Sequence, residues 1–179
     1  PKPSSAASDV YKRQVLGGVC QGHVDMKWCP GVDFSAGSLG MGLSFGMGCS
    51  VAARLEGSKR NIFVMLGDGE IQEGSVWEAA MAAKHHELGN LKVILDRNRI
   101  QNDDFCESQM RMFDIPAKWQ SFGWDVMEID GHDTEDIVKG LDFLVNTNNN
   151  PAILIAHTIK GKGVSYMEDN PAFHGAAPN

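Results

Sequence analysis

Short apolar runs alternate with longer segments of helical periodicity between residues 62 and 157. The apolar runs predict strands at residues 62–66, 91–95, 124–129 and 152–157. The periodic segments between them predict helices at residues 75–88, 115–122 and 135–145. This alternation is typical of parallel β-α-β units, and strands this apolar are typical of a sheet covered by helices on both faces. We therefore predict the α/β class, with a doubly wound, mostly parallel sheet.

The chain ahead of the first predicted strand has a different pattern. Residues 39–55 predict a glycine-laced helix. Residues 1–14 are rich in Pro, Ser and Ala without apolar periodicity, and residues 5–14 resemble adapter-derived sequence, so we predict a non-domain leader of non-native origin. Residues 15–179 are predicted to form one domain that is truncated at both ends.

Composition narrows the class of protein. A chain of 179 residues with 42% hydrophobic content is long enough for one domain with a real core. Its formal net charge of -7 disfavours the basic footprint of a nucleic-acid-binding protein. The cysteines include no C-x-x-C pair, which argues against a zinc or redox site, and no apolar run approaches the roughly 18 residues of a membrane span. We expect a cytoplasmic enzyme with no nucleic-acid or membrane partner.

Polar clusters follow two of the predicted strands at their C-terminal ends. Asp68 lies between Gly67 and Gly69 after the first strand, and Asn98 follows the second strand 30 residues later. A strand-helix-strand unit of that length brings both strand ends to the edge where open α/β sheets bind ligands. Magnesium takes few protein oxygens, and the Asp68 carboxylate, the Asn98 amide oxygen and the Ile100 carbonyl would suffice. The glycines beside Asp68 would let the backbone approach a diphosphate closely.

The wider pattern resembles the transketolase family. Gly67-Asp68-Gly69, followed after about thirty residues by Asn98, is similar to the thiamine-diphosphate motif. Further motifs occur in family order and cover nearly everything from residue 16 to residue 179: Gly22-His23, Pro30-Gly31-Val32-Asp33, Gly37-Ser38-Leu39-Gly40, Glu70-Ile71-Gln72-Glu73-Gly74, Asp96-Arg97-Asn98, Asp130-Gly131-His132-Asp133 and His174-Gly175. The resemblance implies the thiamine-diphosphate-binding fold, which agrees with the α/β prediction.

The resemblance also implies a cofactor and a metal. Asp68, Asn98 and the Ile100 carbonyl are the expected Mg²⁺ ligands. The expected contacts to thiamine diphosphate come from Gly37, Ser38, Leu39, Gly40, Gly69, Asn98 and His174.

The same resemblance implies catalytic residues. His23 and His174 match family histidines that face the thiazolium ring and the hydroxyl and carbonyl groups of the sugar, where imidazole can relay protons. Glu73 matches a buried acid that links the two active sites of a dimer. Glu73 also has a structural explanation, because a negative charge there would favour the start of the following helix.

The implied activity is transfer of a two-carbon ketol unit from a ketose phosphate to an aldose phosphate, a reaction of the pentose phosphate pathway. The glutamate that activates the aminopyrimidine belongs to a separate pyrimidine-binding domain, so this chain alone is expected to be inactive. The expected partners are sugar phosphates and a transketolase C-terminal (pyrimidine-binding) domain or subunit, in a homodimer or heterotetramer. Residues 165–173, a short segment before His174, favour a split enzyme with separate subunits over one long polypeptide.

Some positions depart from the family pattern. Val24 replaces a frequent proline, Ala36 a threonine and Met41 a glutamine, which puts the contacts to the cofactor rings in doubt. A related thiamine enzyme of the dihydroxyacetone synthase type and a non-catalytic cofactor-binding subunit remain alternatives. A dinucleotide-binding oxidoreductase is disfavoured, because Phe45 stands where the third glycine of its fingerprint belongs.

Other polar residues have structural interpretations. His132 precedes an acidic helix start, for which capping is the better explanation. His85 and His86 point in different directions on a helix and are predicted to be solvated. Lys160 and Lys162 could meet phosphate, but Lys162 lacks the following Ser or Thr of a P-loop.

Overall fold

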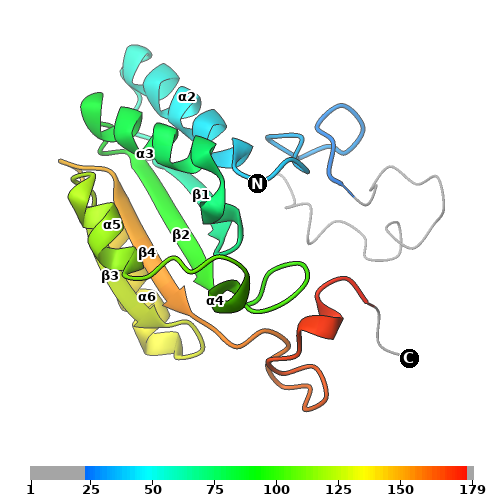
Figure 1. Ribbon diagram of the computed structural model, residues 1–179. Coiled ribbons are helices and arrows are strands. Elements are labelled where there is room, and N and C mark those ends of the chain that lie inside the picture. The colour runs from blue at the N-terminus through cyan, green and yellow to red at the C-terminus, as the bar shows by residue number, and fades with distance from the viewer. Residues whose placement is uncertain (1–22, 177–179) are drawn as a thin grey trace.

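The computed structural model describes residues 23–176, so the predicted leader at residues 1–14 lies outside the described part (Figure 1). The strands are β1 (Ile62–Gly67), β2 (Leu91–Arg97), β3 (Asp125–Asp130) and β4 (Ala152–His157). The longer helices are α2 (Met41–Leu55), α3 (Gly74–His85), α5 (Ile115–Ser121) and α6 (Thr134–Asn146). A short helix α4 (Cys106–Gln109) and two 3-10 turns, η1 (Glu70–Gln72) and η2 (Pro171–Phe173), complete the elements.

The strands form one parallel sheet in the order β1-β2-β4-β3. Strand β1 pairs with β2 from Ile62 against Leu91 to Gly67 against Asp96, so the two strands end side by side. After β2 the chain skips one place in the sheet to form β3, and β4 then fills the place between β2 and β3. These features confirm the predicted α/β class with a doubly wound parallel sheet.

Apolar side chains form a core on each face of the sheet. Val93 and Ile155 belong to the larger core, together with residues of α2, α3 and α5. Leu154 and Ala156 point to the opposite face and pack with Leu144 of α6. Neighbouring positions of β4 thus serve opposite faces, as the period of two in a strand requires. The helices lie in two layers, with α2, α3 and α5 on one side and α6 on the other.

Strand β1 differs from the expectation that helices cover both faces throughout. Phe63 is 49% exposed and Met65 is 69% exposed. They alternate with the buried Val64 and Leu66, which face α2 and α3. The second face is covered by α6 over β3 and β4, and no helix within residues 23–176 packs over the outer face of β1. The strand is therefore half-buried in this chain.

Local signals account for where α5 and α6 begin. Asp114 accepts a hydrogen bond from the Ala117 amide, and proline stands in the first turn of α5. Asp133 accepts bonds from the amides of Glu135 and Asp136 at the start of α6, which confirms the capping interpretation of this segment.

None of the helices in the described range is long and apolar enough to span a membrane.

Candidate functional site

The two predicted polar clusters meet at the C-terminal edge of the sheet. Asp68 follows β1 directly and Asn98 follows β2 directly, and the two strands are hydrogen-bonded neighbours. Both residues are buried: 1% of the surface of Asp68 and 8% of the surface of Asn98 are exposed to solvent. The structure thus brings Asp68 and Asn98 to the same edge of the sheet, as predicted from their positions after the strands.

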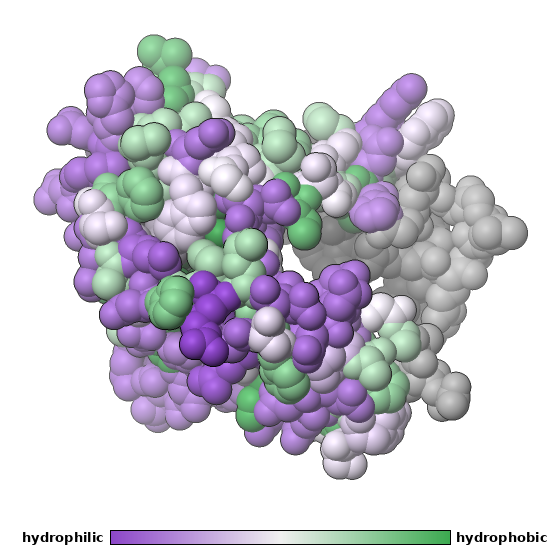
Figure 2. Space-filling model, in the orientation of Figure 1, coloured by the Kyte–Doolittle hydropathy of each residue, from purple (hydrophilic) through white to green (hydrophobic). Residues whose placement is uncertain are grey.

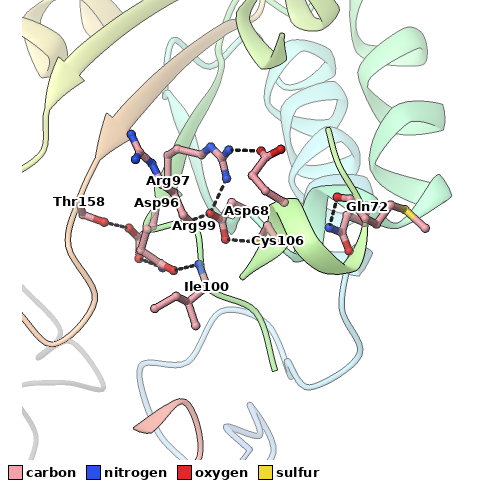
Figure 3. Close-up of polar contacts among 11 residues, drawn as sticks. Asp68, Gln72, Asp96, Arg97, Arg99, Ile100, Cys106 and Thr158 are labelled. Atoms are coloured by element: carbon pink, nitrogen blue, oxygen red, sulfur yellow. Dashed lines mark hydrogen bonds and ion pairs between the residues drawn. The ribbon is translucent and has the colours of Figure 1, made fainter. Parts of the chain in front are cut away.

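Asp68 is held by three donors, which come from the end of β2, from the loop that follows it and from α4. Its Oδ2 accepts a hydrogen bond from Arg97 Nη1 at 2.9 Å and another from the Arg99 backbone amide. Its Oδ1 accepts only the long contact from Cys106 Sγ at 3.4 Å among the described residues. Figure 3 shows Arg97 and Cys106 reaching Asp68 from different sides. The carboxylate is therefore fixed in orientation, and Oδ1 keeps most of its capacity to bind another group.

Arg97 connects this buried carboxylate to the surface. Its guanidinium also pairs with Glu107 Oε1 of α4 at 2.9 Å. The Asp68 side chain is 1% exposed, whereas the Glu107 side chain is 44% exposed. Burial, reinforced by the charge of Asp68, raises the pKa of Cys106 to about 12, so its thiol stays protonated and donates to Asp68.

Asn98 is oriented by its own neighbours. Its Nδ2 donates to Asp96 Oδ2 at 3.0 Å, and its Oδ1 accepts from the Ile100 amide at 3.0 Å. Thr158, after β4, donates to the other oxygen of Asp96. Since Asp96 takes the amide nitrogen, the amide oxygen of Asn98 faces the side on which Ile100 lies (Figure 3).

The turns after β1 and β2 approach each other closely at Gly69. A Cβ atom added at Gly69 would lie 2.8 Å from Gln101 Cβ, so a larger residue there would separate the turns. The side-chain oxygen of Gln101 is buried and accepts no hydrogen bond from residues 23–176. An unpartnered buried oxygen is costly in a folded protein, which fits a site that receives a further polar group.

The donor set at this edge suits Mg²⁺. It offers a carboxylate, an amide oxygen and the backbone of a tight turn, which are hard oxygen ligands of the kind that magnesium prefers. Within residues 23–176, no group of three or more His, Cys, Asp and Glu side chains could hold a metal ion. A metal here would therefore depend on Asn98 and a backbone carbonyl as well as Asp68.

The segment before α2 forms a second wall of the site. Gly40 is the N-cap of α2, with φ 79°, and its amide donates to Glu70 Oε1 at 2.9 Å. Gly37, Ser38 and Leu39 are exposed beside it. Two departures from the family pattern, Val24 and Ala36, are joined by their backbones, because the Ala36 amide donates to the Val24 carbonyl at 3.2 Å.

The predicted catalytic residues occupy different places. His23 is exposed and lies against Gly37, where an added Cβ would come within 3.0 Å of the imidazole. Glu73 is exposed at the N-cap of α3, and its side chain makes no capping hydrogen bond. In this chain Glu73 therefore lies at the surface.

His174 follows η2 and lies within electrostatic range of the Asp68 turn. Burial and the ammonium group of Lys160 lower the pKa of His174, while the carboxylates of Asp103 and Asp68 act in the opposite direction. The imidazole is thus predominantly neutral at neutral pH and can accept a hydrogen bond or a proton.

Two hollows border this edge of the sheet. One, of about 1060 Å³, is lined by His23, Ser38 and Glu70 together with residues of α2 and β1. The other, of about 460 Å³, is lined by Asn98 and Lys160. Figure 2 shows the surface hollowed between the segment that leads into α2 and the polar surface below it. Among the predicted cofactor residues, Gly37, Ser38 and Leu39 line the first hollow and Asn98 lines the second.

Several residues of the site were not singled out from the sequence. Asp68 is contacted by Arg97 and Cys106, and Gly40 is contacted by Glu70. Each of these contacts joins segments that are distant in the sequence and that only the fold brings together. Among the histidines, His85 and His86 are exposed, as predicted. His132 accepts a hydrogen bond from the Ile159 amide at 2.7 Å and so has a structural partner.

The chain is similar to known proteins in sequence and in structure. Residues 5–179 match the family model described as "Transketolase, thiamine diphosphate binding domain", and the match includes part of the predicted leader. The chain is 42% identical over 163 residues to one subunit of an apulose-4-phosphate transketolase from Phocaeicola vulgatus, covering 91% of this chain and 58% of that protein. It is 37% identical over 152 residues to one subunit of a 6-deoxy-6-sulfo-D-fructose transketolase from Clostridium sp., covering 85% and 55%. Among solved structures, the transketolase of Campylobacter jejuni superimposes with a TM-score of 0.84 at 27% identity, over 90% of this chain and 26% of that chain.

Proposed function

Because this chain belongs to the transketolase family and matches its thiamine-diphosphate-binding domain, we propose that it binds thiamine diphosphate and Mg²⁺. The bound cofactor would take part in the transfer of a two-carbon ketol unit between sugar phosphates. The chain spans little more than half the length of the two relatives described above. The names of these relatives, each called a subunit, support a split enzyme with a separate partner.

The observation that carries the proposal is the juxtaposition of Asp68 and Asn98. Both lie at the ends of hydrogen-bonded strands, and neighbouring side chains fix the orientation of each. We assign Asp68 Oδ1, the Asn98 amide oxygen and the Ile100 carbonyl as the metal-binding oxygens. The bond from Arg97 leaves Oδ1 of Asp68 as the less occupied oxygen. Mg²⁺ bound there would neutralise the diphosphate of the cofactor.

The remaining residues of the site would bind and orient. Gly69 and the exposed segment Gly37–Leu39 would lie against the cofactor, since small residues permit close approach. When bound, the cofactor supplies a carbanion and an electron sink. His23 and His174 would accept protons from the sugar and donate protons to it. The lowered pKa of His174 keeps its imidazole neutral and able to accept a proton. Glu73, exposed here, would meet another subunit.

The test is a calorimetric titration of thiamine diphosphate into the full chain with and without Mg²⁺. We expect magnesium-dependent binding that is lost in Asp68→Ala and in Asn98→Ala. Asp142→Ala, which removes an exposed carboxylate on α6, is a control that should retain binding.

A failure to bind would have two explanations that a second titration separates. With a transketolase C-terminal half present, binding that appears only then would show that a domain interface completes the site. No binding by the folded chain under either condition would refute the proposal.

A further inference from the structure

We propose that Glu70 is a positioning residue of the cofactor site: its carboxylate ties the Gly40 end of the segment before α2 to the end of β1, and so holds Gly37–Leu39 beside the Asp68 turn. The inference rests on the proposed function, because it concerns the same site. Glu70 itself is assigned neither to the metal nor to the sugar.

Glu70 is the first residue of η1, two positions after Asp68. Its Oε1 accepts a hydrogen bond from the Gly40 amide at 2.9 Å, and its Oε2 accepts one from the Gly67 amide at 3.1 Å. The two amides belong to segments that are 27 residues apart in the sequence. One carboxylate thus joins the N-terminus of α2 to the C-terminal end of β1, and both bonds are partly buried.

The surroundings of Gly40 leave little freedom at this junction. Gly40 is buried, and a Cβ atom added to it would lie 2.5 Å from Ser75 Oγ and 2.8 Å from Glu73 Cβ. Ser75 also donates to the Gly40 carbonyl at 3.3 Å. The amide of Gly40 is therefore held by the connection between β1 and α3, and its carbonyl by the first turn of α3.

This contact changes what the glycine-rich segment can do. The Gly40 amide is already bound to a carboxylate, so it is unsuited to hold a diphosphate anion. The three residues before it are exposed and adjacent to the hollow that Glu70 also lines. Gly40 is thus the anchor, and Gly37–Leu39 is the part available to the cofactor.

The same anchor bears on His23. Gly37 lies against the imidazole of His23, and the neighbouring Ala36 amide binds the Val24 carbonyl. A shift of the segment at Gly40 would therefore move the ring of His23 relative to Asp68. Substitution of residues that orient metal ligands commonly changes metal affinity or activity by about 10- to 100-fold, and we expect the lower end of that range for Glu70.

The first measurement reads the two hydrogen bonds directly. Amide protons bonded to a carboxylate resonate downfield, so we expect upfield shifts of the Gly40 and Gly67 amide protons in ¹⁵N-labelled Glu70→Ala. In Glu70→Gln, the remaining oxygen can keep one bond, and one of the two amide protons should shift. Unchanged shifts in both variants, or global unfolding of Glu70→Gln seen by circular dichroism, would overturn the proposal, because Glu70 would then not bridge the loops or would hold the whole fold.

The second measurement is the affinity for thiamine diphosphate with Mg²⁺, under the conditions in which the unsubstituted chain binds. We expect binding about tenfold weaker in Glu70→Gln and weaker still in Glu70→Ala, with an unfolding midpoint near that of the parent for Glu70→Gln. Glu78→Gln, an exposed change on α3, is the matched control and should bind as the parent does. Parental affinity in both Glu70 variants would overturn the positioning role. Absence of binding by the unsubstituted chain, both with and without a transketolase C-terminal half, would instead contradict the proposed function, and the amide shifts would still decide whether Glu70 bridges the two segments.

Discussion

Lys92 is a charged residue inside the sheet. Its side chain is fully buried in β2, and its ammonium group donates to the Gly89 carbonyl at 2.5 Å and to the Thr147 carbonyl. Burial lowers the pKa of Lys92 from 10.5 to about 8, although the carboxylate of Asp125 acts in the opposite direction. The two carbonyls explain how a lysine is tolerated in the strand between the buried apolar residues Leu91 and Val93.

This shift predicts a pH dependence of stability with a definite sign. Between pH 8 and pH 10.5 the unfolded chain holds a proton on Lys92 that the folded chain has released, so the free energy of unfolding should rise with pH. The expected gain attributable to Lys92 is about 3 kcal/mol across that window. Urea unfolding at several pH values checks this by comparison with Lys92→Met, which should lack the rise.

Other groups titrate in the same range, so the difference between the two slopes is the decisive quantity. Lys139→Met, a change at a side chain that is 62% exposed, should retain the slope of the parent. Equal slopes in the parent and in Lys92→Met would contradict the prediction, whatever their absolute stabilities.

At the residue scale, the sequence allowed some predictions and not others. Asp68 and Asn98 could be found because each lies within three residues of the end of a predicted apolar strand, and parallel strands end at a common edge. Arg97 and Glu70 could not be assigned contacts, because each bonds to residues about 30 positions away. Pattern alone does not show which of several polar residues in a turn faces inward.

At the element scale, helix α2 contains a natural comparison between two glycines. A Cβ atom at Gly46 would lie 2.3 Å from Val64 Cγ2, whereas a Cβ atom at Gly48 would meet nothing within 4 Å. Gly46 is buried and Gly48 is exposed. The first glycine therefore lets the helix approach β1 closely, and the second has no packing role.

The two positions should respond to alanine with opposite signs. Gly48→Ala should raise the free energy of unfolding by up to about 1 kcal/mol through helix propensity. Gly46→Ala gains the same propensity but must displace Val64, and we expect a net loss of roughly 1–3 kcal/mol from overpacking. Chemical denaturation of both variants measures the signs, and stabilisation by Gly46→Ala would show that the helix can move away from the strand at little cost.

The elements themselves were largely predictable. The predicted strand at residues 152–157 has the bounds of β4, and the predicted starts of the other strands lie within one residue of the observed ones. Helix α4 was missed because four residues are too few to produce helical periodicity. The exposure of Phe63 and Met65 was missed because an apolar run cannot show whether one of its faces lacks a covering layer.

At the scale of the whole molecule, the site is open on one side. The segment before α2 and the segment after β4 extend beyond the end of the sheet in Figure 1, and hollows lie beside both. His23, His174 and Glu73 all belong to exposed positions. The transketolase of Campylobacter jejuni matches this chain over only 26% of its own length. These features support the proposal that the domain acts together with other protein. The sequence of one domain carries no direct signal for the surface of a partner.

That arrangement leads to a prediction about turnover. The full chain, supplied with thiamine diphosphate, Mg²⁺, a ketose phosphate and an aldose phosphate, should form no product, because we propose that a partner domain supplies the groups that enclose the reacting sugars. Addition of a transketolase C-terminal half should restore product formation, which chromatography of the sugar phosphates would detect. The same addition to Asp68→Ala should give no product, and the C-terminal half alone is the blank. Product formed by the unsubstituted chain without a partner would refute the dependence, and it would mean that residues 1–179 already contain every group that the reaction requires.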